Sequence, residues 1–324
     1  MTESRLYNGR IIDAHCHVAS TRFIPKGFVE GTARNIARRL AASGVQRGEQ
    51  VLVDAIVQQH QDHQADGLIG DMDQAGIAQA VLLLPDFTFV MPGPLSIADM
   101  LDEHLAILAR HPGRFGLLAG VDPRWGQAGI DLFERPLEAG LLHGLKLYPP
   151  CGYSPSDRSL YPYFELCRHH QVPVLTHVGP TSPALSFEFA NPWCIDRAAQ
   201  DFPEVNFILA HASMHFTAEC VALAEYRPNV YLDFSAFAGA QPPGAWKTGL
   251  KSLFDKGINH KILFGTDWPL FGGASRHERL IRAFTSEAGP LSGVAAAQRG
   301  WIMAENAARL FAGLGAGNVS GQCI

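Results

Sequence analysis

The sequence predicts an α/β protein built as a single (β/α)8 TIM barrel, and two observations support this fold class. Short apolar runs typical of buried strands alternate along the chain with stretches that have helical periodicity. Eight such pairs can be recognised, and a crossover through a helix makes each strand parallel to the one before it. We therefore expect residues 1–324 to form one domain. A doubly wound open sheet is the alternative, and it does not require all strand ends to converge.

The expected elements follow one another in regular order. The expected strands are 10–15, 79–84, 115–121, 143–148, 173–177, 205–210, 229–234 and 261–266. The expected helices are 63–75, 99–110, 128–139, 160–170, 191–201, 216–225, 247–256 and 276–286.

Two regions are additional to this minimal barrel. Residues 18–60 separate the first strand from its helix, which is far longer than a usual strand-to-helix loop. We expect this insertion, with a helix at 32–43, to lie near the active face as a lid or a dimer contact. Residues 294–312 are expected to form a ninth helix packed outside the barrel, before a Gly-rich tail at 313–324.

Composition narrows the class of protein and its compartment. A hydrophobic content of 47% is typical of a soluble protein with a large core. The formal net charge of −5 gives no basic excess, so neither nucleic acid nor a membrane surface is expected as a partner. The N-terminus has no signal-peptide core, and no apolar stretch approaches a membrane span. Six cysteines without a C-x-x-C pair predict reduced thiols and a cytoplasmic location.

Two histidines stand at the end of the first expected strand, in Ile11-Ile12-Asp13-Ala14-His15-Cys16-His17. Residues two apart on a strand point to the same side, so His15 and His17 are aimed at one point. Two convergent imidazoles are what a divalent metal requires of its first two ligands.

The later strand ends supply more residues of the same chemistry. In a (β/α)8 barrel, functional residues gather at the C-terminal ends of the strands. The residues at those ends are Lys146 on strand four, His177 on strand five, His211 on strand six and Asp267 on strand eight. Three separate strands each end in a residue of a type that binds metals, at the same end of the barrel, and this indicates a shared site.

This constellation resembles the amidohydrolase superfamily, in its branch of metal-dependent hydrolases and decarboxylases related to aminocarboxymuconate-semialdehyde decarboxylase. The motifs that carry the resemblance are Asp13-Ala14-His15-Cys16-His17, Gly144-Leu145-Lys146-Leu147-Tyr148-Pro149-Pro150, Leu175-Thr176-His177, Leu209-Ala210-His211, Leu263-Phe264-Gly265-Thr266-Asp267-Trp268-Pro269 and Glu305-Asn306-Ala307-Ala308-Arg309-Leu310. The resemblance runs nearly from end to end of the chain.

The resemblance implies a role for each of these residues. The implied ligands of one divalent ion, most often zinc, are His15, His17, His177 and Asp267. Asp267 is similar to a carboxylate that also accepts a proton from water during catalysis. His211 is similar to a histidine that acts as general acid and base, or that binds a second metal.

Lys146 bears on the number of metals and on the reaction. In binuclear members of the superfamily, a lysine at the end of strand four is carboxylated and bridges two metals. The motif around Lys146 is similar to that of dihydroorotase, in which the lysine is modified, so Lys146 favours hydrolysis. An unmodified Lys146 would instead attract an anionic group of the substrate.

The function expected from the sequence is metal-dependent hydrolysis of an amide, ester or lactone bond in a small carboxylated molecule. A mononuclear, non-oxidative decarboxylase is the alternative, and a catalytically silent barrel that only binds a ligand is a third hypothesis. The expected partners are a small-molecule substrate and further copies of the chain, in a dimer or larger homo-oligomer.

Several further residues are assigned from their positions alone. The residues expected to line the pocket are Tyr148, Cys151, Tyr153, Asp233, Ser235 and Trp268. His60 and His63, at the start of a polar helix, are expected to be solvated.

Overall fold

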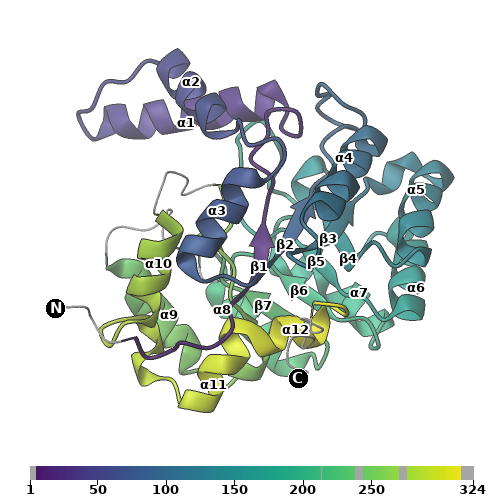
Figure 1. Ribbon diagram of the computed structural model, residues 1–324. Helices are drawn as coiled ribbons and strands as arrows, with labels where there is room; N and C mark the ends of the chain where they lie inside the picture. The colour runs from purple at the N-terminus through teal and green to yellow at the C-terminus, as the bar shows by residue number, and fades with distance from the viewer. Residues whose placement is uncertain (1–4, 213, 238–243, 270–275, 315–324) are drawn as a thin grey trace, which may run out of the picture.

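Eight parallel strands in sequential order form the centre of the molecule (Figure 1). The computed structural model describes residues 5–212, 214–237, 244–269 and 276–314. The strands are β1 Ile12–Cys16, β2 Gln79–Leu84, β3 Phe115–Gly120, β4 Gly144–Leu147, β5 Val174–Thr176, β6 Phe207–Leu209, β7 Val230–Asp233 and β8 Ile262–Leu263. The order β1 to β8 without reversal confirms the barrel and excludes the doubly wound alternative.

Main-chain hydrogen bonds between the segment after β8 and β1 close the barrel. Ala14 donates to the carbonyl of Phe264 at 2.9 Å, and Asp267 donates to the carbonyl of His15 at 2.8 Å. The last strand is nevertheless much shorter than the expected 261–266. Beyond β8, the side chain of Asp13 takes the place of a neighbouring strand: the backbone amide of Thr266 donates to Asp13 Oδ1 at 2.9 Å.

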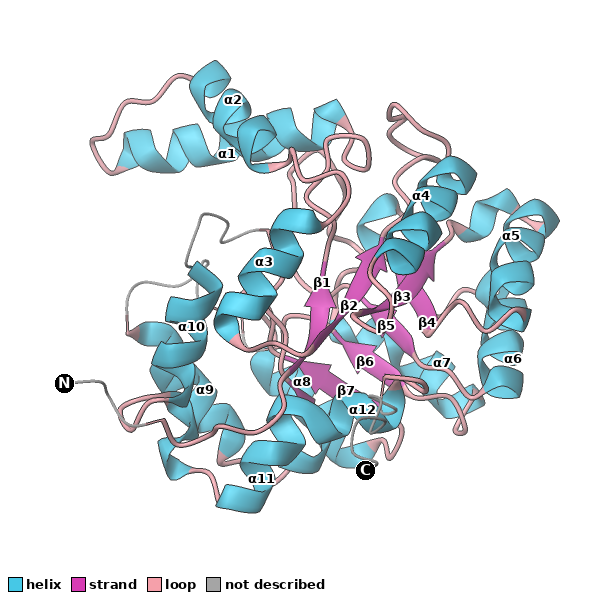
Figure 2. Cartoon of the chain, in the orientation of Figure 1, coloured by secondary structure: helices cyan, strands magenta, loops and turns pink. Residues whose placement is uncertain are grey.

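Helices surround the strands, as the magenta strands inside the cyan helices of Figure 2 show. The helices are α1 Lys26–Ala42, α2 Glu49–Gln59, α3 Asp66–Ala75, α4 Ile97–Arg110, α5 Gln127–Glu138, α6 Tyr161–His170, α7 Asp196–Asp201, α8 Thr217–Tyr226, α9 Ala245–Phe254, α10 Arg276–Thr285, α11 Ala296–Gly300 and α12 Asn306–Leu310. Within the described part of the chain, no helix has the length and apolarity needed to cross a bilayer.

The segment after β1 forms a pair of helices that stands apart from the ring of the other helices (Figure 1). The expected helix at 32–43 begins earlier, as α1 at Lys26. A second helix, α2, packs against α1 and was not expected from the sequence. We call α1 and α2 together the arm. No residue of α2 is fully buried: Leu52, Val53 and Ile56 are half-buried, and Val51 and Val57 are exposed.

The C-terminal segment differs from the expected single helix packed outside the barrel. It is divided into α11, a π-helical turn at Trp301–Glu305, and α12. Its apolar residues pack against the residues that fill the barrel, in one cluster that includes Ile12, Val81, Leu118, Leu175, Ile208, Leu263, Ala307 and Phe311. The segment therefore closes one end of the barrel, because this is where its apolar side chains find a partner. The tail beyond Leu314 lies outside the described residues.

Candidate metal centre

The predicted site residues lie where the strands end. His15 belongs to β1, Lys146 belongs to β4, and His17, His177, His211 and Asp267 follow β1, β5, β6 and β8. All of these residues except His15 line one cavity of about 370 Å³. His15 lies behind it and is fully buried.

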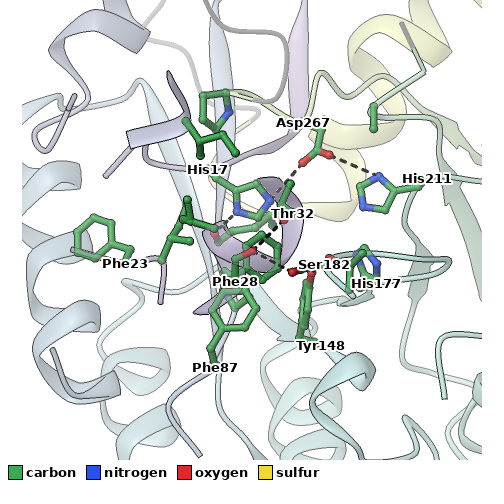
Figure 3. Close-up of a pocket in the computed structure, with 18 of the residues that line it drawn as sticks. His17, Phe23, Phe28, Thr32, Phe87, Tyr148, His177, Ser182, His211 and Asp267 are labelled. Atoms are coloured by element: carbon green, nitrogen blue, oxygen red, sulfur yellow. Dashed lines mark hydrogen bonds and ion pairs between the residues drawn. The ribbon is translucent and has the colours of Figure 1, made fainter. Parts of the chain in front are cut away.

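Two imidazoles and one carboxylate oxygen converge at the centre of the site. His15 Nε2 and His17 Nε2 each lie 3.3 Å from Asp267 Oδ1. Figure 3 shows Asp267 between His17 and His211. Ligand atoms of these three residues lie within 4.8 Å of one another.

The hydrogen bonds on the far side of each ring assign its proton. His15 Nδ1 donates to Asp233 Oδ2 at 2.7 Å, and His17 Nδ1 donates to the carbonyl of Leu83 at 2.8 Å. Both Nε2 atoms then carry a lone pair, and both face the same oxygen of Asp267. His15 Nε2 is a buried atom without a hydrogen-bond partner in the structure.

Three acceptors without a hydrogen between them repel one another unless a cation lies at their centre. Two ligand atoms held tetrahedrally by one zinc ion are about 3.4 Å apart. The two observed separations from Asp267 Oδ1 are both 3.3 Å. His15, His17 and Asp267 therefore fit a divalent metal ion.

A second cluster, formed by His15, His211 and Asp233, is a hydrogen-bond network instead. Ser235 Oγ lies 3.1 Å from His15 Nδ1 and 2.8 Å from His211 Nδ1. Each short contact in this cluster has a proton to share, so no cation is needed there. Its carboxylate orients His15 from behind, as the outer partner of a metal-bound histidine commonly does.

The structure does not bring His177 into the same group of ligand atoms. Its ring centroid lies 4.9 Å from that of His211, and its Nε2 donates to the carbonyl of Gly179 at 3.1 Å. The proton on Nε2 leaves Nδ1 as the nitrogen with a free lone pair. His177 thus lies beside the centre, with the lone pair of Nδ1 available to bind a metal.

Lys146 is almost completely buried, and it still lines the cavity. Its Nζ makes no hydrogen bond to any described residue. Burial lowers the pKa of Lys146 to about 8, although the charges of Asp233 and Asp267 oppose this shift. Lys146 is thus an unpaired amine that opens onto the cavity beside the centre.

Backbone conformation aims two of these side chains. Ala210 points into the barrel, so strict alternation would send the next side chain, His211, outward. His211 adopts a left-handed conformation with φ of 59°, which turns it into the cavity. Asp267 is also left-handed, with φ of 60°. Such conformations are costly for residues other than glycine and gather at functional sites.

Asp13 connects the C-terminal end of β1 to the segment after β8, and these two parts of the chain carry His15, His17 and Asp267. The sequence had not indicated a role for Asp13. Its carboxylate accepts hydrogen bonds from the amides of His15 and Thr266 at 3.1 and 2.9 Å. It also accepts from Thr266 Oγ1 at 2.5 Å and from Cys16 Sγ at 2.9 Å. Desolvation raises the pKa of Asp13. This carboxylate thus fixes β1 against the segment that presents Asp267.

Of the six residues expected to line the pocket, Tyr148 is found among the lining residues that the structure describes. Asp233 and Ser235 lie behind the histidines, as described above. Cys151 and Tyr153 support the lining instead: Tyr153 Oη accepts from the amide of Tyr148 at 2.7 Å. Trp268 stacks on His277, with ring centroids 4.6 Å apart.

The chain is similar to known proteins in sequence family and in fold. The model of the amidohydrolase family matches residues 12–313. One curated relative, protein fluG from Emericella nidulans, is 28% identical over 99 residues. That match covers 31% of this chain and 11% of the relative, so the chain spans a small part of that protein.

Three solved structures share the fold over most of their length. An uncharacterized TIM-barrel protein from Bordetella bronchiseptica has a TM-score of 0.65 and 22% identity, over 93% of this chain and 98% of that chain. The manganese-bound 5-carboxyvanillate decarboxylase from Novosphingobium aromaticivorans has a TM-score of 0.61 and 15% identity, over 93% of this chain and 97% of that chain. A probable 2-pyrone-4,6-dicarboxylic acid hydrolase from Acinetobacter baumannii has a TM-score of 0.58 and 16% identity, over 94% of this chain and 99% of that chain.

Proposed function

Because the chain belongs to the amidohydrolase family, whose members are metal-dependent enzymes, we propose that it hydrolyses an amide, ester or lactone bond in a small carboxylated substrate. We assign His15, His17 and Asp267 as ligands of the metal, with His177 Nδ1 as a further ligand. The nitrogen-rich donor set favours zinc. When bound, the ion supplies a Lewis acid that polarises a carbonyl and makes a water molecule more acidic.

One observation carries the proposal for proton transfer. Asp267 divides its two oxygens between two tasks: Oδ1 faces the imidazoles of His15 and His17, and Oδ2 lies 3.9 Å from His211 Nδ1. Asp267 is thus placed to accept a proton from water, and His211 is placed to deliver a proton to the leaving group. Ser235 Oγ, 2.8 Å from His211 Nδ1, holds the His211 ring in this orientation.

The role of Lys146 decides the number of metal ions. A carboxylated Lys146 would provide anionic oxygens for a second ion, with His211 as a further ligand. An unmodified Lys146 would remain a cation that attracts a carboxylate of the substrate. If Lys146→Ala changes neither metal content nor turnover, the second ion has no place in this enzyme.

Non-oxidative decarboxylation is the second candidate function. A decarboxylase with bound manganese is among the solved structures of the same fold. The same ion would then polarise a substrate that loses CO₂, and His211 or Asp267 would protonate the carbon.

The experiment that separates the two functions uses the metal-loaded protein. We expect it to hydrolyse small carboxylated esters, lactones or amides, with 4-acetoxybenzoate as the first ester to assay, and to release no CO₂ from 5-carboxyvanillate or other aromatic acids. His211→Asn should reduce turnover by about 10²-fold or more while the metal content is retained. Release of CO₂ without any hydrolysis across a panel of esters, lactones and amides would overturn the proposal in favour of the decarboxylase.

A further inference from the structure

The part of the cavity that faces away from the metal centre has an apolar wall. A row of rings leads from the arm to the centre: successive ring centroids of Phe28, Phe87, Tyr148 and His177 lie 5.3, 4.9 and 4.7 Å apart. Figure 3 shows these rings on one side of the cavity. All four residues line it, together with Ile36 and Ile56 of the arm. A ligand in this cavity therefore meets mainly aromatic faces and aliphatic side chains once it leaves the centre, with the uncharged side chains of Thr32, Asn35 and Gln59 as polar neighbours on the arm.

The positive charge that the described lining residues carry lies at the metal end. Among them, Lys146 is the only lysine or arginine. Arg124, at the same end of the barrel, is engaged by the carboxylate of Asp122, with its Nε 2.7 Å from Oδ1.

Two lining histidines add hydrogen-bond acceptors to this wall. His60 Nδ1 donates to the carbonyl of Ile56, and His104 Nδ1 donates to the carbonyl of Met100, both at 2.7 Å. Their Nε2 atoms are left as acceptors. Desolvation lowers the pKa of both rings, for His104 to about 4, so neither ring attracts an anion at neutral pH. His60 is half-buried and lines the cavity at the C-terminal end of α2, whereas the sequence placed it at the start of a polar helix.

We propose that this cavity selects a monocarboxylate with an apolar, planar body, and that the arm is the element that excludes dicarboxylates. The proposal rests on the proposed function, since it places the single carboxylate or scissile group at the metal end beside Lys146. A second carboxylate would lie against Phe28 and Ile56, where it would lose its hydration without gaining a cation. The chain would thereby differ from the structural neighbour that is named for hydrolysis of a dicarboxylic acid.

Binding of a matched pair of probes to the zinc-loaded protein tests this selection. Biphenyl-4-carboxylate and biphenyl-4,4′-dicarboxylate share one shape and differ in the second carboxylate. We expect calorimetric titration to show binding of the monocarboxylate and at least about tenfold weaker binding of the dicarboxylate. Equal or tighter binding of the dicarboxylate would overturn the proposal. Because no turnover is measured, the outcome does not depend on whether the enzyme is a hydrolase.

Two neighbouring residues of α2 provide a matched pair of variants. Ile56 lines the cavity, whereas Val57 is not among the lining residues and has 38% of its surface exposed. Ile56→Asp should weaken binding of biphenyl-4-carboxylate about tenfold or more, because it adds a carboxylate to the apolar wall. Val57→Asp should leave the affinity unchanged. Neither residue is buried, so both variants should fold, as their melting temperatures would verify. Unchanged affinity in Ile56→Asp would show that the arm does not contact the ligand, and would overturn the proposal.

Discussion

At the scale of single residues, the Nδ1 protons of His15 and His17 leave the Nε2 atoms of both rings free to bind a metal. Asp233 holds the proton of His15 on Nδ1, and the carbonyl of Leu83 does the same for His17. The two free lone pairs then meet at Asp267 Oδ1. Burial alone would raise the pKa of Asp233, but the neighbouring His15 lowers it to about 2. Asp233 is therefore ionised and keeps His15 ready to bind a cation.

The first prediction concerns this outer carboxylate. Asp233→Asn removes the charge that orients His15, so the affinity for the metal should fall by about 10- to 100-fold. Competition with a chelator measures that affinity. Asp86→Asn is the matched control, because Asp86 is also a buried carboxylate just after a strand, and it accepts hydrogen bonds from Thr88 and Trp125, away from the centre. Equal losses in the two variants would count against a specific role for Asp233.

The sequence is sufficient to predict the residue types of the site and insufficient to predict their pairing. The spacing of His15 and His17 and the order of the strand ends depend on local periodicity, which a sequence displays. The bond between His15 and Asp233 joins residues 218 positions apart, and no local pattern encodes it. For the same reason, the links from Asp13 to Thr266, which are 253 positions apart, emerge only in three dimensions.

At the scale of elements, close approach of neighbouring strands positions Lys146. Gly120 at the end of β3 lies between the backbones of β2 and β4, where an added Cβ would come within 2.4 Å of the carbonyl oxygen of Leu84 and 3.1 Å of that of Lys146. Backbone atoms of a sheet cannot move aside as a flexible side chain can. The glycine therefore permits the spacing that brings Lys146 to the cavity.

Gly120→Ala should accordingly destabilise the protein by about 1–3 kcal/mol, since the strands must separate to accept the methyl group. Urea denaturation measures the free energy of unfolding. Gly70→Ala in α3 is the control, because nothing lies within 4 Å of its added Cβ. A helix gains about 0.5–1 kcal/mol from this exchange. A loss of stability in Gly70→Ala as large as in Gly120→Ala would contradict the explanation.

The arm shows where prediction of elements fails. The sequence of α2 contains apolar residues, but the helix buries none of them, so amphipathic periodicity gives little guidance. The π-helical turn at Trp301–Glu305 is equally hidden, because it depends on how the C-terminal segment packs under the barrel. The strands, which are buried and apolar, were predicted within a few residues, apart from β8.

At the scale of the whole molecule, the C-terminal segment completes the core. Phe311 is fully buried and belongs to the cluster that fills the barrel. Phe311→Ala should reduce the free energy of unfolding by about 3–5 kcal/mol, because it leaves a cavity under the strands. Tyr226→Ala should change it by about 0.5 kcal/mol or less, since 85% of the Tyr226 surface is exposed. A loss of unfolding free energy in Phe311→Ala as small as that in Tyr226→Ala would show that this segment contributes nothing to the core.

The expected homo-oligomer stays a prediction at this scale. Val51 and Val57 of the arm expose 56% and 38% of their surface. Light scattering coupled to size-exclusion chromatography would give the mass of the particle in solution. We expect at least a dimer, and a monomer at micromolar concentration would show that this prediction is wrong.

We propose that His15, His17 and Asp267 hold a divalent metal ion, and metal analysis of the purified protein is the test of this assignment. Elemental analysis after dialysis should find stoichiometric metal in the wild-type protein and in Asp86→Asn. It should find none in Asp267→Ala, with the secondary structure retained by circular dichroism. Full retention of metal by a folded Asp267→Ala variant would contradict the account.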